Sequence, residues 1–192
     1  MSVRTLLILG AGGHGKAVAE AALLSGEWQR VQFVDDRWPE LKLSFGCAVV
    51  SDMAGLGSVI GEADAAIVAV GNNALRERWI NELSAFGAPL ATIVHPKAWV
   101  SPSAVISEGC VVMAMAVVGV EVTIGRGAIV NTGVSVDHDA ELGDFVHLGI
   151  GVKISGGVKV GSRAWLQAGF CAGYQAIVPE GAQYGPGSKI EA

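Results

Sequence analysis

The segment VNTGVSVDHDAELGDFVHLGIGVKI, residues 130–154, places an aliphatic residue at every sixth position. The same spacing extends over residues 100–190, where fourteen of the sixteen residues at these positions are Val, Ile or Leu. A small residue such as Ala140 stands four positions later in nearly every repeat, and Gly often follows the aliphatic residue directly. A period of six fits neither an α-helix nor an ordinary strand, and it is typical of a parallel β-helix in which each repeat is one short strand and a turn. We expect the aliphatic residue to point inward and the glycine to permit the turn.

The first half of the chain has a different pattern, in which short apolar runs alternate with helical segments. Strands are predicted at 5–9, 31–34, 65–70 and 90–94, and helices at 16–24 and 75–86. Strand–helix alternation of this kind predicts a parallel sheet covered by helices. The sequence therefore predicts an α/β domain over residues 1–95 and an all-β domain, the β-helix, over residues 96–192.

A glycine-rich motif follows the first predicted strand. Residues 10–15 read GAGGHG and match G-x-G-x-x-G at the start of a predicted helix. Asp35 lies twenty residues beyond Gly15, where Rossmann folds carry the acid that binds a ribose. A dinucleotide site would need two mononucleotide-binding halves, and residues 1–95 have room for one. We therefore predict a Rossmann-like domain whose glycines and helix N-terminus face a phosphate; a tight turn without a ligand is the alternative.

Composition excludes several classes of partner. The formal net charge is −5 and no basic run is present, which argues against nucleic acid or an anionic membrane as a partner. No apolar run is long enough to span a bilayer, and no signal-peptide pattern opens the chain. The three cysteines, Cys47, Cys110 and Cys171, show no paired spacing. We therefore expect a reduced, cytoplasmic enzyme.

Four segments, taken in order, resemble a known family. They are GAGGHGK at 10–16, FVDD at 33–36, VGNN at 70–73 and NTGVSVDHD at 131–139. They resemble the bacterial sugar acetyltransferases that join a Rossmann-like domain to a left-handed β-helix, among them bacillosamine-type UDP-4-amino-sugar N-acetyltransferases, perosamine N-acetyltransferases and sialic acid O-acetyltransferases. The resemblance implies a homotrimer, acetyl-CoA as donor, and a nucleotide-linked amino sugar as acceptor, with a UDP-linked 4-amino-4,6-dideoxy sugar favoured. It also implies the left-handed coil, an exception to the usual right-handed crossover.

Acetyl transfer needs a base for the acceptor and hydrogen-bond donors for the oxyanion of the tetrahedral intermediate. Three hexads make one coil of eighteen residues, so His138 and Gly156 are expected to stack at about the strand spacing of 4.8 Å. The resemblance implies that His138 is the catalytic base, that Asp139 orients its ring, and that Gly156 contacts the acetyl-CoA. The alternative is that residues 136–140 form a solvated corner without a catalytic role.

The remaining predicted binding residues fall into two groups. Substrate-binding residues are expected in the Rossmann-like domain: Gly12, Gly13, His14 and Gly15 at the pyrophosphate or sugar, Asp35 and Asp36 at the nucleoside, and Gly71 opposite them. The resemblance also puts His147 and Ala168 near acetyl-CoA, with His147 acting across a subunit cleft because it lies on a different face from His138. Three cations, Lys153, Lys159 and Arg163, could meet the coenzyme phosphates, although a solvated face is the simpler interpretation of each.

Other function classes give different expectations. A γ-type carbonic anhydrase would need a third well-placed histidine in the repeat, so we expect no metal. A sugar O-acetyltransferase of the sialic acid type and a non-catalytic nucleotide-binding trimer remain open alternatives. A metal assay and a test for acetyl transfer from acetyl-CoA would separate these classes.

Overall fold

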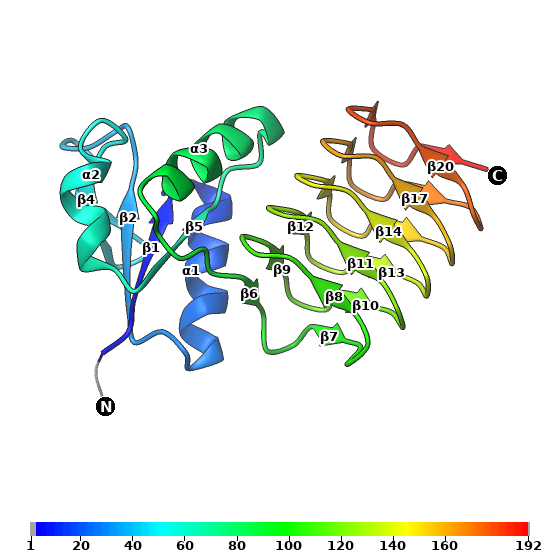
Figure 1. Ribbon diagram of the computed structural model, residues 1–192, viewed down its shortest axis with the longest axis horizontal. Coiled ribbons are helices and arrows are strands. Elements are labelled where there is room, and N and C mark those ends of the chain that lie inside the picture. The colour runs from blue at the N-terminus through cyan, green and yellow to red at the C-terminus, as the bar shows by residue number, and fades with distance from the viewer. Residues whose placement is uncertain (1–2, 192) are drawn as a thin grey trace. The chain divides into compact units, whose positions relative to one another are not determined.

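A computed structural model describes residues 3–191 (Figure 1). The chain divides into two compact units, one ending at Ile93 and the other beginning at Val94. The sequence pattern had suggested a boundary two residues later. No helix within the described residues has the length and apolar character needed to cross a bilayer.

The N-terminal unit is a mostly parallel sheet with helices. Its elements are β1 (Thr5–Leu9), α1 (Gly13–Ser25), β2 (Arg30–Val34), β3 (Leu43–Ser44), β4 (Cys47–Ser51), α2 (Leu56–Val59), the 3₁₀ helix η1 (Ile60–Glu62), β5 (Ala65–Val68) and α3 (Asn73–Ala85). The strand order is β3-β4-β2-β1-β5, and only β3 runs antiparallel to its neighbour. This is the single mononucleotide-binding half expected of a Rossmann-like domain.

The sheet centre and the helix ends follow from local sequence. All five residues of β1 are buried, as expected for a central parallel strand covered on both faces. Helix α1 ends at Gly26, whose left-handed backbone (φ 76°) favours glycine. Helix α3 begins after Asn72, whose side-chain oxygen accepts a hydrogen bond from the Leu75 N–H at 2.9 Å.

One expectation for this unit was wrong, and three elements had not been predicted. The sequence pattern missed the short strands β3 and β4 and helix α2, and it predicted one continuous strand over 90–94. In the structure Leu90 forms only an isolated parallel bridge with Ala66. The chain then leaves this sheet, and β6 (Ile93–Val94) begins a different one. The apolar run is therefore divided between two sheets.

The C-terminal unit is a parallel β-helix of two-residue strands arranged in three sheets, which we call its three faces (Figure 1). The first face contains β6, β9 (Val111–Val112), β12 (Ile129–Val130), β15 (His147–Leu148), β18 (Trp165–Leu166) and β21 (Gln183–Tyr184). The second face contains β7 (Trp99–Val100), β10 (Val117–Val118), β13 (Ser135–Val136), β16 (Lys153–Ile154), β19 (Cys171–Ala172) and β22 (Lys189–Ile190). The third face contains β8 (Val105–Ile106), β11 (Thr123–Ile124), β14 (Glu141–Leu142), β17 (Lys159–Val160) and β20 (Ile177–Val178).

The hexad pattern builds the interior as predicted. Each strand pairs in parallel with the strand eighteen residues away, so Val136 lies beside Val118 and Ile154. The second residue of the strands in the central coils is buried, and so are the small residues four positions later. Phe170, the one large residue at a small position, is also fully buried and packs against the ring of Tyr184 at a centroid distance of 5.0 Å.

The glycines that follow the aliphatic residues have a different role from the one expected. Left-handed φ values recur every six residues at the third position after the aliphatic residue, and several non-glycine residues, including Glu121 and Asp139, adopt them. Gly119 instead stands where a Cβ would come within 2.9 Å of the backbone of Asp137 and His138 in the next coil. The glycine is needed there because successive coils pack closely.

Candidate active site

The corner between β13 and β14 carries a histidine between two carboxylates. The Nδ1 atom of His138 lies 2.6 Å from Oδ2 of Asp139, and the backbone N–H of His138 donates to Oδ1 of Asp137 at 2.8 Å. Asp139 occupies the left-handed position of the turn, with φ 59°, a conformation that Asp tolerates better than most residues. The turn therefore presents three consecutive polar side chains on one outer edge.

The carboxylates define the state of the ring. The hydrogen bond with Asp139, followed by the negative charge of Asp137, raises the pKa of His138 above its ordinary value. Because Nδ1 is bound by Asp139, a neutral ring carries its proton there and leaves Nε2 as the basic atom. Nε2 lies 4.0 Å from Oδ2 of Asp137, and half of the His138 side chain is exposed. The ring can accept a proton from a group that approaches from solvent.

Gly156 lies against this ring, as the eighteen-residue coil predicts. A Cβ on Gly156 would lie 2.7 Å from both Cε1 and Nε2 of His138. The next residue, Gly157, donates its N–H to the carbonyl of His138 at 2.9 Å and fixes the two coils together. Within residues 3–191 the N–H of Gly156 takes part in no backbone ladder, so it remains available to a ligand.

A groove of about 500 Å³ lies on the second face, and Asp137 and His138 are among the residues that line it. The outward residues of four successive strands form its floor and stack in register: Trp99, Val117, Ser135 and Lys153. The ammonium of Lys153 donates to the Gly133 carbonyl and to Oγ of Ser135, each at 3.1 Å. The groove floor is thus apolar at Trp99 and Val117 and polar at Ser135 and Lys153. The sequence pattern did not identify Trp99 or Ser135 as site residues.

Two of the predicted cofactor-binding residues lie elsewhere on the β-helix. His147 is the outward residue of β15 on the first face, and its ring stacks on Trp165 with centroids 6.0 Å apart and an interplanar angle of 19°. Ala168 lies in the corner between β18 and β19, which joins the first face to the second. His138 lies in the corner between the second and third faces. One chain therefore does not bring His147 or Ala168 to His138.

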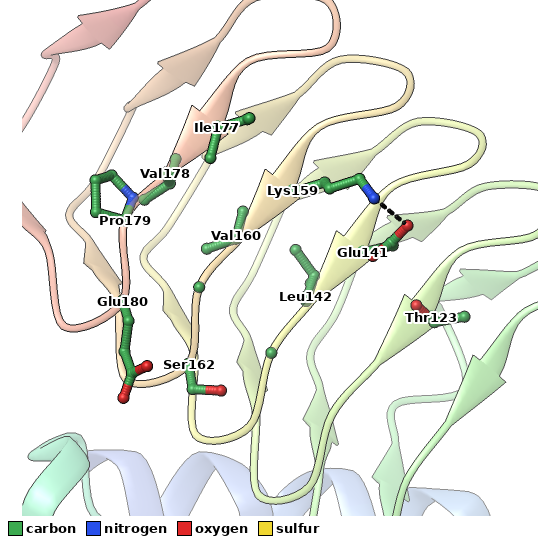
Figure 2. Close-up of a pocket in the computed structure, with 12 residues that line it drawn as sticks. Thr123, Glu141, Leu142, Lys159, Val160, Ser162, Ile177, Val178, Pro179 and Glu180 are labelled. Carbon is green, nitrogen blue, oxygen red and sulfur yellow. Dashed lines mark ion pairs between the residues drawn. The ribbon is translucent and has the colours of Figure 1, made fainter.

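A second hollow, of about 480 Å³, lies on the third face (Figure 2). Lys159 lines this hollow and pairs with Glu141, with Nζ 3.0 Å from Oε1. Figure 2 shows this ion pair as a dashed line. Arg163 in the neighbouring corner pairs with Glu180 at 2.7 Å. Both cations are thus held by carboxylates, in keeping with a solvated face.

In the N-terminal unit, the predicted binding loops follow β1 and β5, which are adjacent strands. Chain order reverses between these strands, and ligands of open α/β sheets bind beyond the carboxyl ends of the strands at such a point. Residues 10–12 follow β1, and Gly71 comes shortly after β5. His14 lies in the first turn of α1 and is half-buried.

The glycines of the first loop serve different purposes. A Cβ on Gly15 would collide with the Gly10 carbonyl, so the fold itself requires glycine there. A Cβ on Gly12 or Gly13 would meet no described atom within 4 Å, and Gly12 has an ordinary φ of −78°. Gly12 is the N-cap of α1 and no side chain caps the helix. These two glycines therefore leave the N–H groups of the first helical turn open to a ligand.

The two predicted nucleoside-binding acids differ in their partners. The carboxylate of Asp35 accepts a hydrogen bond from the N–H of Ala11 at 2.7 Å. Its oxygens also accept hydrogen bonds from Nε and Nη2 of Arg37, at 2.7 and 3.0 Å. The hydrogen bonds from Arg37 lower the pKa of Asp35 to about 2. Asp36 is exposed, and Oδ1 accepts the Met53 N–H at 3.1 Å. Asp35 therefore ties the glycine-rich loop to the end of β2, and Asp36 is the more accessible of the two.

Sequence reasoning missed a buried arginine that supports the opposite loop. Arg76 in α3 is fully buried. Its Nη1 donates to the carbonyls of Val70 and Gly71 at 3.1 and 3.3 Å, and Nη2 donates to Oδ1 of Asn73 at 3.1 Å. A charged residue in a helical pattern usually marks a solvated face, so no pattern in the sequence indicates this role.

The chain is similar to one known domain family and to several solved structures. The sequence model of the protein family described as the PglD N-terminal domain matches residues 5–83. The acetyltransferase domain of PglB from Neisseria gonorrhoeae, in complex with acetyl coenzyme A, is 39% identical with a TM-score of 0.93, and the match covers 99% of this chain and 94% of that one. A histidine-to-asparagine variant of perosamine N-acetyltransferase from Caulobacter crescentus, in complex with CoA and GDP-perosamine, is 33% identical with a TM-score of 0.82 and coverage of 100% and 92%.

WeeI from Acinetobacter baumannii, at 21% identity and a TM-score of 0.74, shares the fold, and its match covers 98% of this chain and 89% of that one. A comparison with curated protein sequences gives no significant match. The PglB and perosamine structures match both units at more than 30% identity over nearly their full lengths. With its Rossmann-like unit followed by a β-helix, the chain belongs to the family of nucleotide-sugar acetyltransferases that contains these enzymes.

Proposed function

We propose that this chain transfers the acetyl group of acetyl-CoA to the amino group of a nucleotide-linked sugar, with a UDP-linked 4-amino-4,6-dideoxy sugar as the favoured acceptor. The observation that carries the proposal is the His138–Asp139 pair stacked against Gly156, with His138 also lining the groove on the second face. The proposal is supported by relatives whose structures hold acetyl-CoA, or CoA with GDP-perosamine.

His138 acts as the general base in this proposal. The acceptor amine attacks the thioester carbonyl of acetyl-CoA while Nε2 of His138 takes a proton from the amine. Asp139 holds Nδ1 and stabilises the imidazolium that forms. The thiolate of CoA then leaves with a proton from the imidazolium, which restores the base. General acid–base catalysis of this kind typically contributes about 10²–10⁴-fold.

Gly156 supplies the oxyanion contact. Because this residue has no side chain, the thioester can approach the backbone beside the His138 ring. Its N–H would donate to the carbonyl oxygen as negative charge develops there. Such a donor can contribute about 10²–10³-fold when it is fixed before the reaction begins. The base and the donor are both fixed by the stacking of two successive coils.

The N-terminal unit binds the nucleotide part of the acceptor. The open N–H groups at Gly12 and Gly13 would receive the pyrophosphate, and Asp36 would meet the nucleoside. Asp35 would hold the loop rather than the ligand, because Arg37 and the Ala11 N–H already occupy its carboxylate.

The functional form is a homotrimer. His147 and Ala168 lie on other parts of the β-helix than His138, so they can join its site only from a neighbouring copy. Exposed apolar residues on the second face and its corners, Trp99, Val117 and Val120, support burial against another copy. Native mass spectrometry at micromolar concentration should give the trimer mass, and a monomer would contradict the shared site.

A ligand panel followed by a transfer assay tests the proposed function. UDP-, GDP- and CMP-linked sugars should each be tested for a rise in melting temperature, because a ligand that binds only the folded state stabilises it. The nucleotide-sugars that bind are then incubated with acetyl-CoA, and the products are separated chromatographically. We expect an N-acetylated sugar and one equivalent of CoA. Acetylation only at a hydroxyl would support the O-acetyltransferase alternative instead.

A further inference from the structure

Asp137 lies on the opposite side of the His138 ring from Asp139. Oδ1 of Asp137 accepts the backbone N–H of His138, and Oδ2 lies 4.0 Å from Nε2, the atom left free to act as the base. The side chain is 61% exposed and lines the groove on the second face. One carboxylate thus orients the ring through Nδ1, while the other lies 4.0 Å from Nε2, the atom that an acceptor must approach.

Sugar amines are mostly protonated near neutral pH, so an amine acceptor arrives largely as an ammonium ion. A hydroxyl acceptor has no charge at any working pH. An ammonium group that reaches Nε2 from the groove comes within reach of Oδ2 of Asp137, and a hydrogen bond between an ammonium and a carboxylate is about twice as strong as a neutral one. The other cation of the groove, Lys153, is directed to the Gly133 carbonyl and Ser135 Oγ.

We propose that Asp137 binds the ammonium form of the acceptor at Nε2 of His138 and thereby selects an amine over a hydroxyl. This inference rests on the proposed function and adds the residue that determines acceptor chemistry. It also separates the roles of the two neighbouring acids: Asp139 positions the base, and Asp137 contacts the substrate.

Bonds and protons balance over the steps of this reaction. The bound ammonium loses one proton to solvent, and the free amine then attacks the thioester carbonyl to form the C–N bond while Nε2 of neutral His138 takes a second proton from the nitrogen. The C–S bond breaks, and the departing thiolate takes the proton from the imidazolium to give CoA. One ammonium and one acetyl-CoA therefore give one amide, one CoA and one released proton.

Binding measurements with two acceptors test the inference. The probes are the UDP-linked 4-amino-4,6-dideoxy sugar and the UDP-linked 6-deoxy sugar that carries a hydroxyl at carbon 4. Wild type, Asp137→Asn and Glu121→Gln are compared by calorimetry at low ionic strength. Glu121 is an exposed acid at the same edge one coil away, so its variant removes a nearby charge outside the groove.

We expect wild type and Glu121→Gln to bind the amine about tenfold more tightly than the hydroxyl sugar. Asp137→Asn should lose this preference through weaker amine binding, with affinity for the hydroxyl sugar unchanged. An Asp137→Asn variant that weakens both sugars equally would show that Asp137 only shapes the turn, and one that keeps the preference would also overturn the inference.

Different results would overturn this inference and the proposed function. A wild-type enzyme that acetylates the amine but binds the two sugars equally would overturn the role of Asp137 alone. A wild-type enzyme that acetylates no amino sugar would overturn the proposed function and this inference together.

Discussion

Replacing Gly156 with Ala adds one methyl group at the point where the His138 ring contacts the next coil. That methyl would lie 2.7 Å from Cε1 and Nε2 of the ring. Since carbon atoms pack at about 3.5–4.0 Å, the ring must move by roughly 1 Å. A displacement of this size at a reacting group can cost about 10²-fold in rate. We therefore expect Gly156→Ala to lower kcat about 10- to 100-fold.

The stability of the variant distinguishes this explanation from misfolding. Gly156 has no left-handed φ, and its close neighbour is a half-exposed side chain that can move, so the melting temperature should stay near the wild-type value. Gly185→Ala is the silent control, because its Cβ meets no described atom within 4 Å. Gly149→Ala is the destabilising control, because its Cβ would lie 2.8 Å from the backbone nitrogen of Ala168.

The assay combines chromatographic quantification of the acetylated sugar at saturating acetyl-CoA with a melting curve for each variant. If Gly156→Ala retains wild-type kcat, the position of the His138 ring does not govern the reaction. If it loses stability as Gly149→Ala does, the glycine serves the fold instead.

Further predictions concern stability, pH and substrate binding. Glu121→Gly should raise the melting temperature by about 2–4 °C with kcat unchanged, because glycine removes the roughly 1 kcal/mol cost of a left-handed residue at φ 58°. Asp139→Gly should gain less, because Asp tolerates this conformation better and its bond with His138 is lost, and its kcat should fall; equal kcat values in the two variants would count against a role for Asp139. The wild-type rate should rise with pH through a pKa above about 6.5, because His138 acts as a base only when its ring is deprotonated. In a pH–rate profile, Asp139→Asn should move this rise to lower pH, and an unmoved profile would contradict the assignment of His138. Asp36→Ala should raise the KM for the nucleotide-sugar and leave that for acetyl-CoA nearly unchanged, and equal changes would contradict a nucleotide site in the N-terminal unit.

The β-helix could be predicted in detail because every hexad forms the same unit, one short strand with an inward aliphatic residue and one turn. An inward aliphatic residue at each sixth position fixes the strands, and eighteen residues per coil fix their register. The same arithmetic predicts that Gly156 lies against His138, as it does in the structure. It could also have found the groove, since Trp99, Val117 and Ser135 are spaced by eighteen residues.

The N-terminal unit was less predictable because its important contacts are not periodic. Strands β3 and β4 form a short hairpin whose sequence shows no clear alternation. The pairing of Asp35 with Arg37 uses two residues of one turn, and the burial of Arg76 depends on two carbonyls in the loop after β5. No spacing rule distinguishes such residues from ordinary surface charges. The glycine-rich loop was located correctly, but which of its glycines the fold itself requires became clear only from the space around each one.

The most direct test of acetyl transfer by a histidine base is the kcat of His138→Ala on an acceptor that the wild-type enzyme acetylates. The side chain is half exposed, so its removal should leave the fold and the affinity for acetyl-CoA intact. We predict that kcat falls by about 10²–10⁴-fold. A loss of less than about tenfold would show that His138 is a surface residue and that the base is His147 or solvent.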